Sequence, residues 1–151
     1  MADLTGTHTY QLDPKGRISL PARFRAAFVE GAFLTLGQEG CLYAFPAPEW
    51  ERQSEEARAT PQSGAQARAY ARMFFGNAEP VDLDSQGRLL VPQKLRTQVG
   101  IAREAVVRGV GSYMEIWERG TFEGYEQQYR PAYEAGSLQA GGSSGGQRSD
   151  R

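Results

Sequence analysis

One stretch of this chain occurs twice. Tyr10–Arg25 reads YQLDPKGRISLPARFR and Val81–Arg96 reads VDLDSQGRLLVPQKLR, and six of these 16 aligned positions are identical at a constant spacing of 71 residues. The identical residues include glycine, proline and charged types in a single register, which chance rarely produces. A repeat at fixed spacing predicts two copies of one structural unit. We therefore expect one repeat over 7–52 and a second over 78–123.

Each copy has the pattern of a β-β-α-β-β unit. A strand, a tight turn and a second strand favour a hairpin, and a short helix with proline in its first turn follows. Two more strands complete the unit. The expected strands are 10–12, 17–20, 33–36 and 41–45 in the first copy, and 88–91, 105–108 and 113–117 in the second after its own opening strand.

The tight turn has the same chemistry in both copies. Asp13 and Asp84 can accept hydrogen bonds from the turn backbone, and Gly16 and Gly87 tolerate a positive φ. These four are the predicted turn-forming residues. Four positions after each aspartate comes an arginine, Arg17 or Arg88. This arginine either forms an ion pair with the aspartate, or is oriented by it so that its guanidinium points outward, and the sequence leaves both arrangements open.

The shortness of the strands constrains the fold. Four short strands cannot bury two faces by themselves, so the two units are expected to interlock around one core. The predicted fold class is mainly β with α additions (α+β), arranged as a pseudo-twofold β-barrel built from two intrachain β-β-α-β-β repeats.

Helical segments follow each copy. Residues 53–77 are expected to form a helical insert, interrupted near Thr60–Gly64, and residues 124–135 a C-terminal helix. Aromatic residues recur at helical spacing between 122 and 133, and they pack against the insert or dock on a neighbouring subunit. The Gly/Ser-rich segment 136–151 is expected to be a disordered tail. The recurring aromatic residues are Phe122, Tyr125, Tyr129 and Tyr133.

The net charge conceals a local excess of cations. It is −1 in total, which taken alone argues against nucleic-acid binding, because such proteins are usually basic. The alternative for these cations is a solvated hairpin with scattered surface charge, but a repeated basic hairpin suits a partner that repeats, as a DNA duplex does. We expect DNA contacts from Lys15, Arg17, Arg23 and Arg25, and weaker ones from Arg88, Lys94 and Arg96.

The residues that enzymes use are scarce. The chain has one histidine, His8, and one cysteine, Cys41, and neither a phosphate-cradling glycine loop nor a Cys/His set with metal spacing is present in the sequence. We predict no catalytic activity, no metal and no cofactor, with Cys41 as a small core residue. Four acids of the insert region are expected to form a solvated helix face: Glu49, Glu51, Glu55 and Glu56.

The location of the protein is also predicted from its sequence. No apolar run of about 18 residues is present, and residues 1–10 lack the pattern of a signal peptide. With a single cysteine, no internal disulfide can form. We therefore expect a cytoplasmic protein without a membrane partner.

Several strings together resemble a known family. The strings LDPKGRISLPARFR, GCLYAFPAPEWE, ARMFFGNA, LDSQGRLLVPQKLR and GVGSYMEIWE are similar to the MraZ family of bacterial transcriptional regulators, within the AbrB/SpoVT superfamily of DNA-binding barrels. The resemblance covers about residues 6–129. It implies an AbrB/SpoVT-like swapped-hairpin barrel, with the family's DNA-contacting basic residues falling on Lys15 and Arg17, and on Arg23 and Arg25.

The same resemblance implies how such a protein works. It would assemble with itself into a closed ring homo-oligomer and bind direct repeats in a promoter. It would act mainly as a repressor of its own cell-division and cell-wall operon and associate with the nucleoid. The alternative is a protein-binding, antitoxin-like module of the same barrel class, although the tail offers a partner only one large apolar residue, Leu138.

Overall fold

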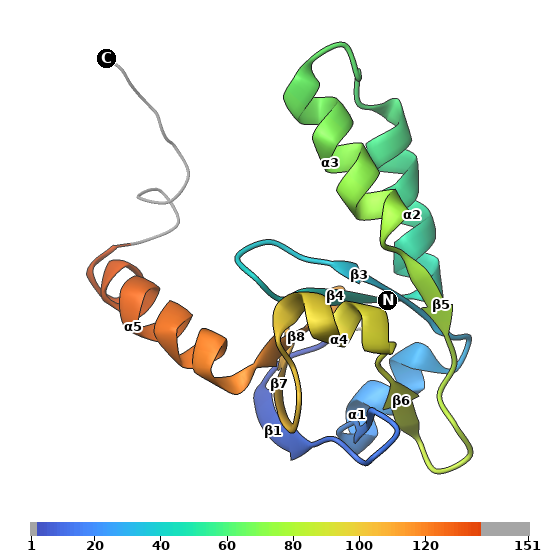
Figure 1. The fold of residues 1–151 in the computed structure, drawn as a ribbon, viewed down its shortest axis with the longest axis vertical. Helices are drawn as coiled ribbons and strands as arrows, with labels where there is room; N and C mark the ends of the chain where they lie inside the picture. Colours follow the sequence, from blue (N-terminus) through green and yellow to red (C-terminus); the bar gives the residue numbers. More distant parts are fainter. Residues whose placement is uncertain (1–2, 137–151) are drawn as a thin grey trace. The chain divides into compact units, whose positions relative to one another are not determined.

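The computed structural model describes residues 3–136. Residues up to Arg119 form one compact unit and residues from Gly120 onward form a second. In the first unit, pairs of consecutive strands are separated by helices, and the paired strands run antiparallel, so the fold is α+β (Figure 1). The expected tail, 136–151, lies outside the described residues apart from Gly136.

Six strands form the larger sheet, in the order β1-β7-β8-β4-β3-β5, with every neighbouring pair antiparallel. Two further strands, β2 and β6, form a separate antiparallel pair. The strands are β1 (Thr7–Gln11), β2 (Arg17–Ser19), β3 (Ala32–Leu36), β4 (Leu42–Pro46), β5 (Glu79–Val81), β6 (Arg88–Leu90), β7 (Glu104–Gly109) and β8 (Met114–Glu118).

The two repeats exchange strands. β1 of the first repeat pairs with β7 of the second, and β5 of the second pairs with β3 of the first. The expected hairpin ladder between 10–12 and 17–20 is therefore wrong: the turn forms, but its two strands separate toward different partners. Pairing β2 with β6 instead sets Ile18 opposite Leu89, and both side chains are fully buried. Two separate local hairpins would leave these apolar faces uncovered.

The second hairpin of each repeat forms as expected. β3 pairs with β4 over five residues, and β7 with β8 over five residues. β4 and β8 then pair with each other and join the two hairpins into one sheet. Cys41 lies immediately before β4, is fully buried, and donates its thiol hydrogen to the carbonyl of Gln38, so its expected place in the core is confirmed.

Short helices follow β2 and β6 at equivalent positions. α1 (Ala22–Arg25) continues as a 3₁₀ turn, η1 (Ala26–Phe28), and α4 (Gln93–Val99) is its counterpart. Proline directly precedes each helix, where its fixed φ suits helix entry and its missing N–H costs nothing. Phe24, Phe28 and Leu95 turn inward and are buried.

Both repeats contribute to one hydrophobic core. Matching positions are buried in each copy, which is what one shared core requires. Neither sheet closes on itself within residues 3–136, so the structure shows an α+β fold with a mainly antiparallel sheet rather than a closed barrel. The matched core residues are Ile18 and Leu89, Leu20 and Val91, Phe24 and Leu95, Ala32 and Ala105, Leu34 and Val107, and Leu42 and Met114.

Two helices lie between the repeats, side by side in Figure 1: α2 (Ala47–Ala59) and α3 (Ala65–Gly76). Their aromatic residues hold them to each other and to the sheet. Trp50 stacks on Phe33 of β3 and on Phe74 of α3, with ring centroids 4.7 and 5.1 Å apart. Thr35 donates its hydroxyl hydrogen to the carbonyl of Phe74 at 2.6 Å.

One acid of α2 is not solvated. Glu49 was expected on an exposed face with its neighbours, but its side chain is buried and accepts hydrogen bonds from Arg52, Gln53 and Ser112. Burial acts to raise the pKa of Glu49, and these donors more than offset it, so that the pKa lies below its usual value. The prediction is wrong here because Ser112, from the loop between β7 and β8, covers this turn of the helix.

The helix α5 (Arg119–Ala135) begins at the last residue of the first unit and otherwise belongs to the second, and it starts before the expected position 124. Tyr125 and Tyr129 are in contact one helical turn apart, with ring centroids 4.5 Å apart, and the Tyr133 side chain is largely exposed. Whether this aromatic face meets the insert or a neighbouring subunit remains a prediction. No helix within residues 3–136 has the length and apolar character needed to cross a membrane.

Candidate nucleic-acid interface

Two aspartate-anchored turns define the candidate site. Asp13 Oδ1 accepts hydrogen bonds from the backbone N–H groups of Lys15 and Arg17, both at 2.9 Å. Asp84 repeats this at 2.9 Å with Gln86 and Arg88. The two turns therefore share one hydrogen-bonding pattern, in which a single carboxylate oxygen orders the backbone that presents the following residues.

A glycine completes each turn. Gly16 has a φ of +87° and Gly87 a φ of +75°, a region that residues with a Cβ seldom occupy. Each glycine N–H donates to the carbonyl of the aspartate three residues earlier, at 2.9 Å. The paired Asp and Gly positions of the sequence repeat thus correspond to two turns of one conformation.

The turn carboxylates are ionised at neutral pH. The backbone hydrogen bond from Arg17 is the largest influence on Asp13, and together with the Arg17 side chain and the Lys15 backbone it lowers the pKa to about 2. The pKa of Asp84 is lowered for the same reasons, with the Arg88 backbone bond foremost. A fixed negative charge facing phosphates would be repelled, so the aspartates serve to shape the turns.

The arginine of each repeat pairs with its own aspartate. Arg17 Nε donates to Asp13 Oδ2 at 2.6 Å, and Arg88 Nε donates to Asp84 Oδ2 at 2.9 Å. Both arginine side chains remain about 30% exposed, at 29% and 28%. The Nη groups of Arg17 make no hydrogen bond within residues 3–136, so they stay available to an acceptor outside the protein.

The two turns also meet across the pseudo-twofold. Arg88 Nη1 lies 3.5 Å from Asp13 Oδ2, so Asp13 pairs with an arginine from each repeat. The pairing of β2 with β6 makes this possible, because it sets Ser19 opposite Arg88 and Arg17 opposite Leu90. This contact could not be predicted from the sequence, because the spacing of residues within one repeat does not reveal which residues pair between the repeats.

Lys15 and Lys94 project without a carboxylate partner. Lys15 is exposed at the tip of the first turn, where Gln86 occupies the equivalent place in the second. Lys94 is exposed on α4. Among the described residues 3–136, neither ammonium group forms an ion pair, and an exposed lysine of this kind suits a phosphate group as a mobile point charge.

Arg23 is held at the surface by uncharged contacts. Its Nη1 donates to the hydroxyl oxygen of Thr5 at 3.1 Å, and its guanidinium carbon lies 5.2 Å from the centre of the Phe24 ring. These contacts orient the group without cancelling its charge. Thr5 is a participant that the sequence did not reveal, because it lies outside the repeated segment.

Arg25 and Arg96 are anchored differently from the other cations. Arg25 Nε donates to the carbonyl of Leu20 at 3.2 Å, and Arg96 Nε donates to the carbonyl of Val91 at 2.8 Å. The seven candidate residues thus fall into three sets with different surroundings: Lys15, Arg23 and Lys94 project, Arg17 and Arg88 pair with the turn aspartates, and Arg25 and Arg96 bond to backbone carbonyls.

The resulting surface has more cations than carboxylates. The segment 10–25 carries four cations against one acid, and 81–96 carries three against two. Guanidinium and ammonium groups placed on ordered backbone can contact phosphates, and an arginine with unoccupied Nη donors can also address base edges. The geometry therefore suits recognition of a polyanion, with the first repeat as the more basic half.

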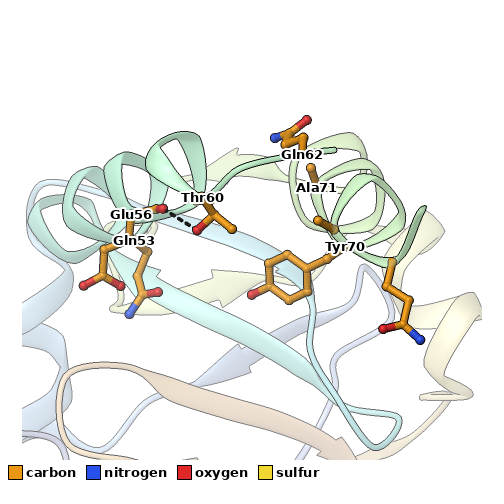
Figure 2. Close-up of a pocket in the computed structure, with 9 residues that line it drawn as sticks. Gln53, Glu56, Thr60, Gln62, Tyr70 and Ala71 are labelled. Atoms are coloured by element: carbon orange, nitrogen blue, oxygen red, sulfur yellow. Dashed lines mark hydrogen bonds between the residues drawn. The ribbon is translucent and has the colours of Figure 1, made fainter. Parts of the chain in front are cut away.

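A separate groove lies between α2 and α3 and has a volume of about 460 Å³ (Figure 2). Amide, hydroxyl and alanine side chains dominate its lining, as Gln53, Thr60 and Ala71 illustrate. Its one carboxylate, Glu56, already pairs with Arg52, and Thr60 donates to the backbone carbonyl of Glu56, drawn dashed in the figure. The lining of the groove includes no lysine, arginine or histidine.

The described part of the chain contains no metal centre by geometry. Within residues 3–136, no group of three or more His, Cys, Asp or Glu side chains is placed to hold a metal ion. The one histidine, His8, is surrounded by Tyr10 and Phe24 rather than by further ligands.

Comparison with known proteins agrees with the repeat. A family model described as "MraZ protein, putative antitoxin-like" matches residues 4–73 and again residues 74–136. The protein named transcriptional regulator MraZ from Kineococcus radiotolerans is 45% identical over 128 residues, which cover 85% of this chain and 90% of that protein. The one from Salinispora arenicola is 47% identical over 120 residues, covering 80% and 84%.

A third relative gives a similar match. Transcriptional regulator MraZ from Pelotomaculum thermopropionicum is 42% identical over 129 residues, covering 85% of this chain and 89% of its own. The two matches to one family model meet between Met73 and Phe74, inside α3, and together they cover every described residue except Asp3. With two copies of the family's unit, and with relatives above 40% identity that are matched over 84–90% of their length, this chain belongs to the MraZ family.

Proposed function

We propose that this chain is a transcriptional regulator that binds double-stranded DNA through the two aspartate-anchored turns and the helices that follow them. The observation that carries the proposal is the duplicated turn: the same ordered backbone presents cations twice, from one core, in the segments 13–17 and 84–88. The naming of the relatives as transcriptional regulators supports it. The relatives' regulatory names also support a role without catalysis.

The candidate residues take different parts in this proposal. Lys15 and Arg23 supply phosphate contacts, because their charges are exposed and have no carboxylate partner within residues 3–136. Arg17 supplies Nη donors to phosphates or to base edges while Asp13 holds its Nε. Arg88 and Lys94 make the weaker contacts of the second repeat, where Gln86 replaces the tip lysine.

The proposed assembly is a closed ring of identical chains on direct repeats in a promoter. The support is quantitative: a few phosphate contacts per chain bind DNA weakly at physiological salt. Several chains in one ring make the later contacts intramolecular, which can raise the overall affinity by about 10²–10⁴. Head-to-tail neighbours suit direct repeats, and closure of such contacts produces a ring.

The biological role follows from the family resemblance. We propose that the chain mainly represses its own cell-division and cell-wall operon, acting in the cytoplasm on nucleoid DNA. Repression fits a ring that covers successive promoter repeats, because the occupied DNA is then closed to the transcription machinery.

We also propose an architecture for the chain. The exchanged strand pairs β1–β7 and β5–β3, together with β2–β6, are interpreted as a pseudo-twofold swapped-hairpin barrel of the AbrB/SpoVT type. The proposed boundaries are 7–52 and 78–123 for the repeats, 53–77 for the insert and 124–135 for the C-terminal helix, with 136–151 as the tail segment.

The test is binding to the chain's own promoter region. Fluorescence anisotropy is measured with a labelled duplex of that region and with a scrambled duplex, for the parent chain, Lys15→Ala and Arg23→Ala. Arg72→Ala serves as the matched control, because Arg72 is an exposed arginine on α3, outside both repeats. The two turn-side variants should bind less tightly and Arg72→Ala should bind as the parent does.

The outcomes separate the candidate functions. Equal binding of both duplexes would contradict sequence-specific regulation. Absence of binding, combined with tight capture of a protein encoded beside this chain, would favour the antitoxin-like alternative, which the description of the family model keeps in view.

A further inference from the structure

We infer that Arg25 and Arg96 are positioning residues, each of which holds the DNA-facing turn of the opposite repeat in place. The inference rests on the proposed function and refines it. Both residues were expected to contact DNA, as the other basic residues were. Their contacts instead place each arginine against the turn of the opposite repeat, so that they link the two repeats.

The first observation is a close approach between repeats. A Cβ added to Gly16 would lie 2.6 Å from Cζ and Nε of Arg96 and 2.7 Å from its Nη2. The reciprocal holds for Gly87, whose added Cβ would lie 2.7 Å from Cδ and Nε of Arg25. Each arginine therefore lies directly against the glycine of the other repeat's turn, and only a glycine leaves it room.

The second observation is how each arginine is fixed at its other end. Arg96 Nε donates to the carbonyl of Val91, the residue after β6, at 2.8 Å. The N–H of that same Val91 donates to the carbonyl of Gly16 at 2.9 Å. Arg96 and the Val91 backbone together hold the Gly16 turn, one through side-chain packing and the other through a hydrogen bond.

The chemistry of the side chain explains why arginine occupies both positions. A guanidinium is planar, so it can lie flat on a glycine while its Nε, near the stem, bonds to a carbonyl. A lysine has neither the plane nor a donor at that point of its stem. Nor does a carboxylate compete for these groups, because among residues 3–136 neither Arg25 nor Arg96 forms an ion pair.

The consequence concerns Lys15 and Arg17. They flank Gly16, so the backbone that presents them is held from the second repeat by Arg96. Affinity is gained when a binding loop is fixed before the partner arrives, since less motion is lost on binding. Removing Arg96 should therefore weaken DNA binding through residues of the first repeat, although Arg96 belongs to the second.

The salt dependence of DNA affinity distinguishes a residue that holds the turn from a residue that contacts a phosphate. Log affinity falls linearly with log salt concentration, with a slope of about 0.9 for each phosphate contact on duplex DNA. Anisotropy titrations at four salt concentrations should show Arg96→Ala binding several-fold more weakly with the parent's slope. Lys15→Ala, by contrast, should lower the slope by about one contact. A slope lowered equally by Arg96→Ala would assign Arg96 to the DNA and overturn the inference.

A double-mutant cycle locates the effect. If Arg96 acts through the first turn, Arg96→Ala should cost much less affinity when Lys15 is already alanine than in the parent chain. Arg25→Ala is the matched control, because it acts on the second turn, and its effect should add in full to that of Lys15→Ala. Full additivity of Arg96→Ala with Lys15→Ala would contradict the proposed action through the first turn.

The conservative variant provides a further check. Arg96→Lys keeps the positive charge but loses the plane and the Nε donor, so it should bind as weakly as Arg96→Ala. Parental binding by Arg96→Lys would show that charge alone matters. Circular dichroism verifies folding, and loss of the folded state in both variants would place Arg96 among the residues that the fold itself requires, which would also overturn the inference.

A readout without DNA separates this inference from the proposed function. The Val91 amide hydrogen is held by Gly16, so Arg96→Ala should speed its exchange with solvent while amides of β3 keep their parental rates. If the parent chain bound no DNA, the regulator proposal would fail while this result still stood. Unchanged Val91 exchange in the variant would show that Arg96 does not hold the turn.

Discussion

Arg88 of the second repeat lies 3.5 Å from the carboxylate of Asp13 in the first, which also accepts a 2.6 Å hydrogen bond from Arg17. One acid thus serves two cations that are 71 residues apart in the sequence. The aspartate was expected to shape its own turn; in the structure it also fastens that turn to the other repeat.

The shared carboxylate predicts unequal effects of two matched substitutions. Asp13→Asn keeps an oxygen for the backbone N–H groups but loses the ionic attraction to Arg17 and Arg88, whereas Asp84→Asn loses that to Arg88. Asp13→Asn should therefore lower Tm more than Asp84→Asn, at one protein concentration and low salt. Equal losses of Tm would show that the contact between repeats contributes nothing.

The lowered pKa of Asp13 predicts a loss of stability in acid. The folded-state pKa is about 2 against an ordinary 3.8, so below pH 3.8 the unfolded chain binds the proton more readily than the folded chain. The stabilisation is complete above pH 3.8 and is lost as the pH falls through about 2. Denaturant midpoints from pH 5 to pH 2 should fall more for the parent than for Asp13→Asn; parallel curves would contradict this.

Gly16→Ala should destabilise the protein. Alanine would be forced to a φ of +87° and its Cβ would press on the Arg96 guanidinium. We expect a loss of about 1–3 kcal/mol in the free energy of unfolding. Gly124→Ala is the control, because it lies inside α5 with open space around the added Cβ. There alanine should be neutral or stabilising by about 0.5–1 kcal/mol.

Leu95→Ala tests the shared core. Leu95 is fully buried on α4, in a core to which both repeats contribute. Truncation should cost about 2–5 kcal/mol in the free energy of unfolding, from lost burial and the cavity left behind. Denaturant unfolding should show one transition for tryptophan fluorescence and circular dichroism, since both repeats lose the same core. Two separate transitions would indicate that the repeats unfold independently.

Cys41 should be unreactive in the folded protein. Burial raises the pKa of its thiol far above the usual range, and the side chain has no exposed surface. Because the thiolate is the reactive form, a thiol reagent at pH 8 should modify the folded chain far more slowly than the chain in denaturant. Rapid modification of the folded chain would show that this end of the sheet opens readily.

The sequence was most informative where structure depends on neighbours along the chain. The Asp13–Gly16 and Asp84–Gly87 segments predicted turns, and β3 with β4 and β7 with β8 pair as their positions indicated. The break between α2 and α3 lies at the Thr60–Gly64 segment that proline and glycine marked. In each case the controlling residues are within a few positions of the structure they determine.

The sequence was least informative where partners are distant. The local sequence does not reveal that β1 pairs with β7 rather than with β2. Every strand offers the same backbone N–H and C=O groups, so these groups do not specify which strand will be the partner. The same applies to Arg88 with Asp13, to Arg23 with Thr5, and to Glu49, which looked solvated until Ser112 covered it. A charge pattern identified the basic residues as a set, but only their contacts divided them by task.

The pairing of β1 with β7 has a consequence for synthesis of the chain. Thr7 pairs with Arg108, which is made 101 residues later. During translation, the backbone hydrogen-bonding groups of β1 remain without their β7 partner until nearly three quarters of the protein has been synthesised. Contacts this distant slow folding and prolong exposure to aggregation. A nascent chain ending before β7 should therefore depend on chaperones, and a premature stop should yield no partly working half.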